Sequence, residues 1–149
     1  MWGANKSKEL KNRIELRKNR IINFKKNQLT KTIKEKAKGF YKIEDYVKFN
    51  KSYLNPNLSL ETLSKELNLS EGYISQLVNK NSNVNFNDYI NTLRINEAKN
   101  MLTNEDYNNY TIVAIGLEAG FNSKSSFYTA FKKFTGKTPV EFKKGVRNL

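Results

Sequence analysis

Lysine and hydroxyl side chains share one face of a predicted helix near the C-terminus of this 149-residue chain. That face contains no acidic residue, and it consists of Lys124, Ser125, Tyr128, Thr129, Lys132 and Lys133. Lysines attract phosphates and hydroxyls form hydrogen bonds, so the chemistry suits a polyanionic partner. The alternative interpretation is an ordinary helical hairpin whose lysine face is only solvated.

The residue types that catalysis and metal binding use most are missing. The chain has no histidine and no cysteine, which removes the commonest general base, thiolate ligands and disulfides. Serine, aspartate, lysine and tyrosine occur, but no spacing places a base beside a nucleophile. We therefore expect no enzyme, no cofactor and no metal site.

Two predicted helices and a glycine turn position the lysine face. The first helix has apolar residues at helical spacing, which are Ile112, Ile115, Leu117 and Ala119. Gly120 then breaks the helix, Phe121 enters the core, and Asn122 or Ser123 caps the second helix. The buried stripe of that helix is expected to be Phe127, Ala130, Phe131 and Phe134. A helix, a glycine turn and a capped basic helix are typical of a helix-turn-helix motif.

The same pattern occurs earlier in the chain. At an offset of 52 residues, Leu60, Leu63, Leu67 and Leu69 match Ile112, Ile115, Ala119 and Phe121. After the turn, at an offset of 53, Ile74, Leu77 and Val78 match Phe127, Ala130 and Phe131. Ser59 and Ser70 precede the two earlier helices as caps. Two motifs in tandem are much less likely to arise by accident than one.

A longer helix is predicted between the two motifs. Apolar residues recur at helical spacing over 85–102, and Asn85 or Asn87 is expected to cap the segment. Before the first motif, Ile43, Tyr46, Val47 and Phe49 predict a short amphipathic helix beginning near Tyr41. After the second motif, Gly136 ends the helix, and Pro139 starts a last one with Val140 and Phe142 facing inward.

The charge of the chain is unevenly placed. Its formal net charge is +13, and residues 1–40 hold 13 Lys/Arg against 3 Asp/Glu. We expect these residues to form a basic arm that is disordered or marginally helical. No apolar run approaches the ~20 residues of a membrane span, and no signal peptide is visible, so a cytoplasmic location without a membrane span is expected.

Residues 41–145 resemble the DNA-binding domain of the AraC/XylS family of transcription regulators. The stretch GFNSKSSFYTAFKKFTGKTPVEFKK follows that family's second motif, with Gly120, Phe121, Phe127, Gly136 and Pro139 in place. INTLRINEAKNML is similar to its linker helix. One departure is Gly116, where the family usually has alanine, and this glycine is expected to loosen the helix by roughly 1 kcal/mol. Another departure is Thr129, where the family often has an arginine that could contact guanine.

The resemblance implies an all-α fold of two helix-turn-helix subdomains joined by a linker helix and preceded by the basic arm. The first subdomain would be 41–82, the linker helix 85–102 and the second subdomain 110–145, within a domain of 41–149. Family members with a full-length chain usually carry a sensor in front, so this chain resembles the output end of such a regulator.

The resemblance also implies where DNA would be contacted. Base edges would be read by Gly72, Tyr73, Ser75, Gln76, Asn79, Lys124, Ser125, Tyr128 and Thr129. Phosphates would be held by Lys80, Lys132, Lys133 and Lys137. Arg94 and Glu97 on the linker helix are expected to be structural, through a surface or interdomain ion pair.

The hypothesis is therefore a sequence-specific transcription regulator that binds double-stranded DNA in adjacent major-groove segments, with RNA polymerase as a further expected contact. Two alternatives stay open. A helical protein-interaction adaptor would need an exposed apolar patch on the recognition helices. A non-specific basic nucleic-acid-binding protein would bind scrambled DNA as well as any selected site.

Overall fold

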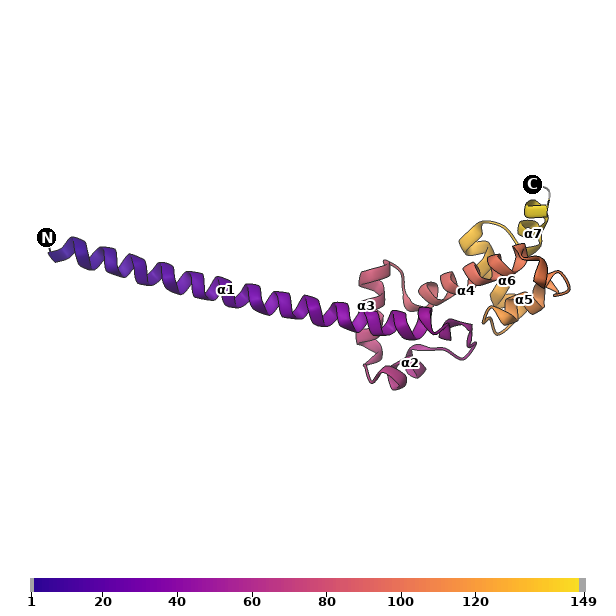
Figure 1. The fold of residues 1–149 in the computed structure, drawn as a ribbon, viewed down its shortest axis with the longest axis horizontal. Helices are drawn as coiled ribbons and strands as arrows, with labels where there is room; N and C mark the ends of the chain where they lie inside the picture. Colours follow the sequence, from indigo (N-terminus) through magenta and orange to yellow (C-terminus); the bar gives the residue numbers. More distant parts are fainter. Residues whose placement is uncertain (1, 148–149) are drawn as a thin grey trace. The chain divides into compact units, whose positions relative to one another are not determined.

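The computed structural model describes residues 2–147, and every element among them is helical. The chain divides into an N-terminal segment that ends at Gly39 and a C-terminal domain that begins at Phe40, and each is described by itself. Helix α1, Trp2–Glu44, includes the whole described part of the N-terminal segment (Figure 1). No separate helix begins at Tyr41, because α1 continues through Gly39 to Glu44.

The N-terminal segment exposes its side chains from residue 3 to residue 35. The exposed residues include large apolar ones such as Leu10, Phe24 and Leu29, and an exposed ion pair joins Arg13 to Glu9 at 3.4 Å. Helices in proteins owe most of their stability to packing of an apolar face. That residues 1–40 form a basic arm that is disordered or marginally helical stays a prediction.

The first helix-turn-helix unit (residues 41–82) consists of π-turn η1 (Asp45–Phe49), 3₁₀ turn η2 (Ser52–Leu54), α2 (Leu60–Leu67) and α3 (Glu71–Ser82). Its core includes Val47, Leu63 and Ile74. Phe49 was predicted to face inward but is 61% exposed. It lies six residues after buried Ile43, a spacing that places it on a different face of the helix.

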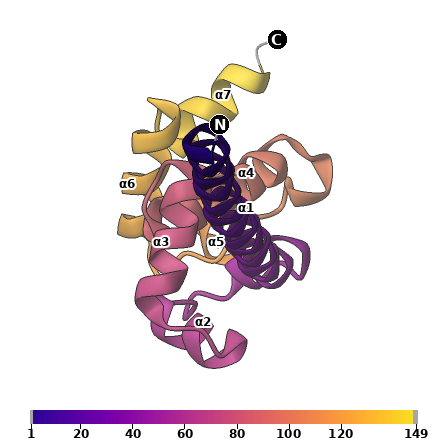
Figure 2. The same ribbon diagram turned by 90° about the vertical axis from the view of Figure 1, so that its left-hand side faces the viewer.

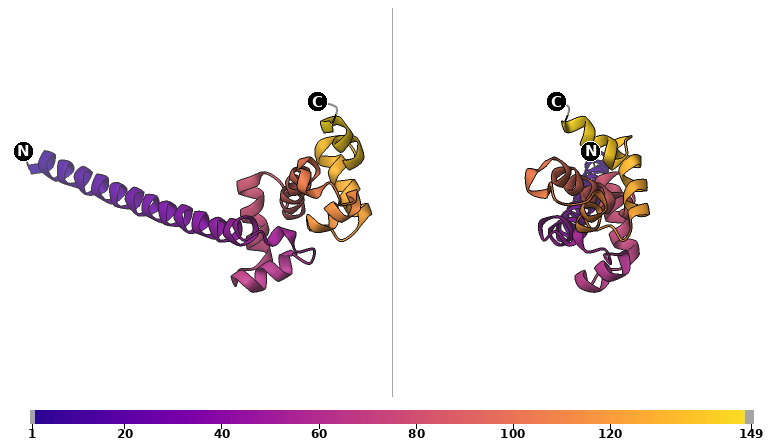
Figure 3. Two further views of the ribbon diagram at one scale, coloured as in Figure 1. Left: turned by 45° about the vertical axis from the view of Figure 1, so that its right-hand side comes forward. Right: turned by 90° about the vertical axis from the view of Figure 1, so that its right-hand side faces the viewer.

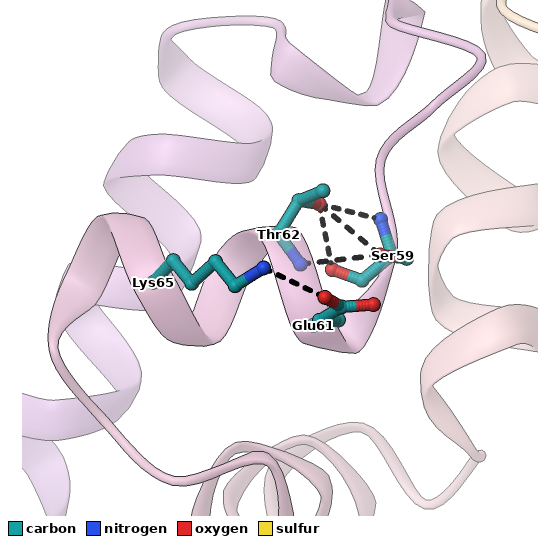
Figure 4. Close-up of polar contacts among 4 residues, drawn as sticks. All are labelled: Ser59, Glu61, Thr62 and Lys65. Carbon is teal, nitrogen blue, oxygen red and sulfur yellow. Dashed lines mark hydrogen bonds and ion pairs between the residues drawn. The ribbon is translucent and has the colours of Figure 1, made fainter.

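Serine caps start both helices of this unit, as the sequence predicted. Ser59 and Thr62 form a reciprocal capping box at α2: the Thr62 N–H donates to Ser59 Oγ (3.1 Å) and the Ser59 N–H to Thr62 Oγ1 (2.9 Å). Figure 4 shows this box beside the ion pair of Lys65 and Glu61 at 2.7 Å. Ser70 caps α3 by accepting from the Tyr73 N–H.

The linker helix α4 spans Phe86–Thr103 and is capped by Asn85, close to the predicted bounds. A short 3₁₀ turn, η3 (Glu105–Tyr107), follows it. Helix α4 contacts α3 and η2 as well as α5, α6 and α7. Figures 1 and 3 show α4 between the α2–α3 pair and the helices that follow it, and Figure 2 shows α2 and α7 at opposite ends of the C-terminal domain.

The second unit (residues 110–145) contains α5 (Ile112–Glu118), α6 (Lys124–Thr135) and α7 (Pro139–Arg147). Ser123 caps α6, and Gly136 ends it in the left-handed conformation, as predicted. Leu117 was predicted to be buried but is 48% exposed, because it lies two residues from buried Ile115 and so on the opposite helix face. Val140 is also exposed, and Pro139 takes the buried place beside it.

Candidate nucleic-acid interface

The outer face of α3 carries the polar residues that were predicted to read base edges in the first unit. Gln76, Asn79 and Lys80 are exposed, while Tyr73 and Ser75 are half-buried. Gly72 is exposed on the first turn of α3, and a Cβ added there would meet nothing within 4 Å. No packing within the domain therefore requires glycine at this position.

The outer face of α6 carries the lysine and hydroxyl residues predicted for the second unit. Lys124, Ser125 and Thr129 are exposed. Tyr128 is half-buried, packs edge-on against Phe127 and lies under the Lys124 ammonium group, which is 5.4 Å from its ring centroid. These contacts fix the position of the aromatic ring on an otherwise solvated face.

An open depression of about 530 Å³ lies along this face and is lined by Tyr128, Thr129, Lys132, Lys133 and Thr138. Thr138 was not among the predicted contact residues, although it accepts from the Glu141 N–H at the start of α7. The position before Pro139 is a signal for such a cap, since proline favours the first turn of a helix. Four of the five lining residues therefore belong to the predicted contact set.

Lys133 is already engaged within the domain. Its ammonium group lies 2.6 Å from Asp88 Oδ1, which joins α6 to the first turn of α4. The two side chains differ in exposure, at 58% for Lys133 and 22% for Asp88. The residues are 45 positions apart, so no local spacing in the sequence could indicate this pair.

Arg94 on α4 is buried and binds backbone rather than an acidic side chain. Its Nε donates to the Tyr53 carbonyl at 2.7 Å and its Nη2 to the Asn55 carbonyl at 2.9 Å. Burial lowers the pKa of the Arg94 guanidinium. Its structural role was expected, but the expected ion pair was wrong, because carbonyl oxygens accept its hydrogen bonds. Its helical spacing from buried Ile90 and Ala98 was the available signal.

Glu97, one turn along α4 from Arg94, meets the expectation of an ion pair. Its carboxylate accepts a hydrogen bond from the Tyr53 hydroxyl at 3.0 Å and lies 3.8 Å from the Lys51 ammonium. Burial, together with the Glu97 carboxylate, raises the pKa of Tyr53 to about 12. The phenol therefore stays protonated and remains a donor at neutral pH.

Gly116 in α5 is required by packing, contrary to the expectation that it only loosens the helix. A Cβ at this position would lie 2.6 Å from Cγ of Phe127. Phe127 is fully buried and cannot move aside easily. In this chain the close approach of α5 and α6 leaves no room for alanine.

Within residues 2–147 no group of acidic side chains is arranged to hold a metal ion. In the same described range, no helix is long and apolar enough to cross a bilayer.

Two exposed, serine-capped helices on one linker helix define a tandem helix-turn-helix domain. Residues 63–145 match the family described as helix-turn-helix domain. A solved structure with 31% identity, the C-terminal domain of the response regulator yesN from Fusobacterium nucleatum, superposes with a TM-score of 0.61 and is covered to 98%. That match includes 71% of the present chain. The chain therefore belongs to the AraC-type helix-turn-helix family of DNA-binding transcription regulators.

Curated relatives are similar over the same region. An uncharacterized HTH-type transcriptional regulator of Staphylococcus aureus is 36% identical over 66% of the chain, which spans 12% of that relative's length. The Msm operon regulatory protein of Streptococcus mutans is 30% identical over 65% of the chain and 34% of its own length. The DNA-binding domain of AdpA, solved with a target DNA, shares 17% identity at a TM-score of 0.59, over 66% of this chain and 85% of that one, and this likeness concerns the fold alone.

Proposed function

We propose that the chain binds a specific double-stranded DNA sequence by placing α3 and α6 in adjacent major-groove segments. The observation that carries this proposal is that α3 and α6 both expose a polar, acid-poor face and both pack against the same helix, α4. Helix α4 has 18 residues and is therefore about 27 Å long. Major-groove segments on one side of B-DNA are ~34 Å apart, which is of the same order as the length of α4.

The first recognition helix would read bases through amide side chains. Gln76 and Asn79 are exposed on the same face of α3, and amides can donate and accept at the major-groove edge of adenine. Gly72 supports a close approach, because its missing side chain serves no packing inside the domain. Tyr73 and Ser75 complete the proposed base-reading set of the first unit.

The second recognition helix would combine hydroxyl contacts with stronger phosphate binding. Ser125, Tyr128 and Thr129 offer hydroxyls beside Lys124, and Lys132 and Lys133 line the depression together with Tyr128 and Thr129. Lys80 and Lys137 are exposed and would hold phosphates at the edges of the two recognition surfaces. Lys133 would have to exchange Asp88 for a phosphate or be shared between them.

The adaptor alternative is less well supported. It requires an exposed apolar surface on the recognition helices, yet the large exposed hydrophobic residues of residues 40–147 lie elsewhere, for example Phe49, Tyr110 and Leu117. We also propose contact with RNA polymerase and a cytoplasmic location, because the family consists of transcription regulators. A role without catalysis is proposed on the same basis.

The decisive experiment is selection of bound sequences from a random duplex library, followed by affinity measurements at a stated salt concentration. A reproducible motif of two half-sites, bound at least about 10³-fold more tightly than scrambled DNA, is the expected result. Equal affinity for selected and scrambled duplexes would instead support the non-specific nucleic-acid-binding alternative.

A further inference from the structure

The two helix-turn-helix units have separate hydrophobic cores. The first core takes Phe86 and Ile90 from the N-terminal half of α4, and the second takes Ile95, Ala98 and later residues from its C-terminal half. Among residues 3–146, whose burial the structure describes, no buried residue belongs to both cores. Apolar packing therefore joins the two units through α4, which supplies residues to both cores.

Arg94 lies on α4 between the residues of the two cores. It is 8% exposed, and its two hydrogen bonds hold the Tyr53 and Asn55 carbonyls, which belong to the first unit. Its guanidinium carbon also lies 5.9 Å from the ring centroid of Phe121, which belongs to the second core. One side chain thus contacts both units.

The turn of the second unit closes against the same place. Gly120 has φ +99, and a Cβ there would lie 3.0 Å from Arg94 Nε and 3.0 Å from the Leu54 Cα. Because glycine has no Cβ, the turn can pack directly against Arg94 and the η2 backbone. A guanidinium has a rigid fork of donors, so it holds two carbonyls in one geometry.

We propose that Arg94 is a positioning residue that fixes the angle and separation of α3 and α6, and thereby sets the half-site spacing in DNA that the chain accepts. The part that concerns DNA depends on the function proposed above, whereas the part that concerns the geometry of the two units does not.

The geometry is tested by measuring the distance between two spin labels. The chain has no cysteine, so Glu66→Cys in α2 and Glu118→Cys in α5 give two exposed labelling sites in an otherwise unchanged chain. The test variant is Arg94→Met, and the matched control is Lys99→Met, which removes the same charge from the same helix. We expect a shifted or widened distance distribution for Arg94→Met and the parent distribution for Lys99→Met.

A folded Arg94→Met variant with the parent's distance distribution would overturn the proposal. If Arg94→Met does not fold, as judged by circular dichroism, Arg94→Lys carries the test. Lysine keeps the charge but has no planar fork, so it can hold the two carbonyls less firmly. A parent-like distribution for folded Arg94→Lys would then be the contradicting result, and a widened one the expected result.

The consequence for DNA is tested with the selected duplex and a series in which one or two base pairs are inserted between its half-sites. The parent should lose about 10-fold or more in affinity with each insertion, because the second half-site turns away around the helix axis. Arg94→Met, or Arg94→Lys where the former does not fold, should flatten this dependence to within about 3-fold. Simple destabilisation would lower the amount of active protein without changing the ratio between spacings. Absence of binding to every duplex would contradict the proposed function, while the distance measurement would still decide on the geometry.

Discussion

The turns of the two helix-turn-helix units both contain a residue with positive φ, but the residue differs. Asn68 ends α2 with φ 52, and Gly120 follows α5 with φ +99. Asn68 is exposed, so a side chain that tolerates the left-handed region is sufficient there. Gly120 is buried against the η2 backbone, where no side chain fits. The two turns therefore match in sequence but differ in surroundings. The first turn faces solvent, and the second packs against the η2 backbone of the first unit.

The recognition helices differ in charge as well. Helix α3 has one acidic and one basic residue, Glu71 and Lys80, whereas α6 has Lys124, Lys132 and Lys133 and no acidic residue. This difference favours a division of labour, in which α3 contributes more to base reading and α6 more to phosphate binding.

The largest expected difference concerns the residue after each turn. Phe121 is 4% exposed in the second core, while Leu69 is half-buried beside the first. Phe121→Ala should lower the free energy of unfolding by about 3–5 kcal/mol, and Leu69→Ala by about 2 kcal/mol. Urea unfolding followed by circular dichroism measures both, and equal losses would show that the two turns are buried alike.

Alanine at the positive-φ positions of the turns should give the next largest difference in stability loss between the two units. Gly120→Ala combines left-handed strain with overpacking against η2 and should cost about 2–4 kcal/mol. Asn68→Ala meets only the strain and should cost about 1 kcal/mol. The difference between these two variants in urea midpoint is the measurement, and similar midpoints would contradict a buried second turn.

Gly116 gives a prediction in which the sign matters. Helix propensity alone says that Gly116→Ala should stabilise α5 by about 1 kcal/mol. Contact with Phe127 says instead that it should destabilise the domain by about 1–3 kcal/mol. In the first unit the equivalent residue is Ser64, whose hydroxyl donates to the Leu69 carbonyl at 2.6 Å. Ser64→Ala, the matched control, should cost about 1 kcal/mol. Thermal melting of both variants decides, and a higher melting temperature for Gly116→Ala would exclude the packing argument.

The division of labour between α3 and α6 can be tested with one substitution in each. Gln76→Ala should change which bases are preferred, because it removes about 1–3 kcal/mol of discrimination at the base pair that Gln76 reads. Lys132→Ala, which has no ion pair in the described structure, should weaken all duplexes alike and lower the salt slope by about one unit. Binding profiles of both variants over the selected library give the answer. A uniform loss for Gln76→Ala would mean that α3 does not read bases there.

The smallest expected effect on sequence preference comes from the basic residues of α1. A chain beginning at Lys36 keeps Phe40, which packs against the first core, and removes most of the excess positive charge of residues 1–40. Without these charges the salt dependence and the affinity for scrambled DNA should fall, while the preferred sequence stays the same. The parent and the shortened chain would be compared across a salt series. An unchanged salt slope would show that the arm does not contact DNA.

Local patterns predicted most of the C-terminal domain, because caps and apolar spacing are local. Ser59, Ser70, Asn85 and Ser123 all cap the helices that the sequence assigned to them, though it left open Asn87 for α4 and Asn122 for α6. The errors at Phe49, Leu117 and Val140 arise at helix ends, where a shift of one or two residues turns a side chain to the other face.

The contacts of Arg94 and Lys133 could not be predicted in the same way. Their partners lie about 40 residues away in the chain, and two of those partners are backbone carbonyls. The close approach of α5 and α6 at Gly116 is also a tertiary feature, which helix propensity cannot indicate. The DNA-contact residues follow from resemblance to the family, and their assignment stays a prediction.

The acceptors of Arg94 have a consequence for the evolution of the domain. Every residue at positions 53 and 55 supplies a carbonyl oxygen, so substitutions there can leave both hydrogen bonds in place. Arg94 can therefore stay constant in descendants of this chain while the neighbouring side chains drift. Covariation between positions would not reveal these two hydrogen bonds, because a backbone carbonyl accepts each of them whatever side chain its residue carries.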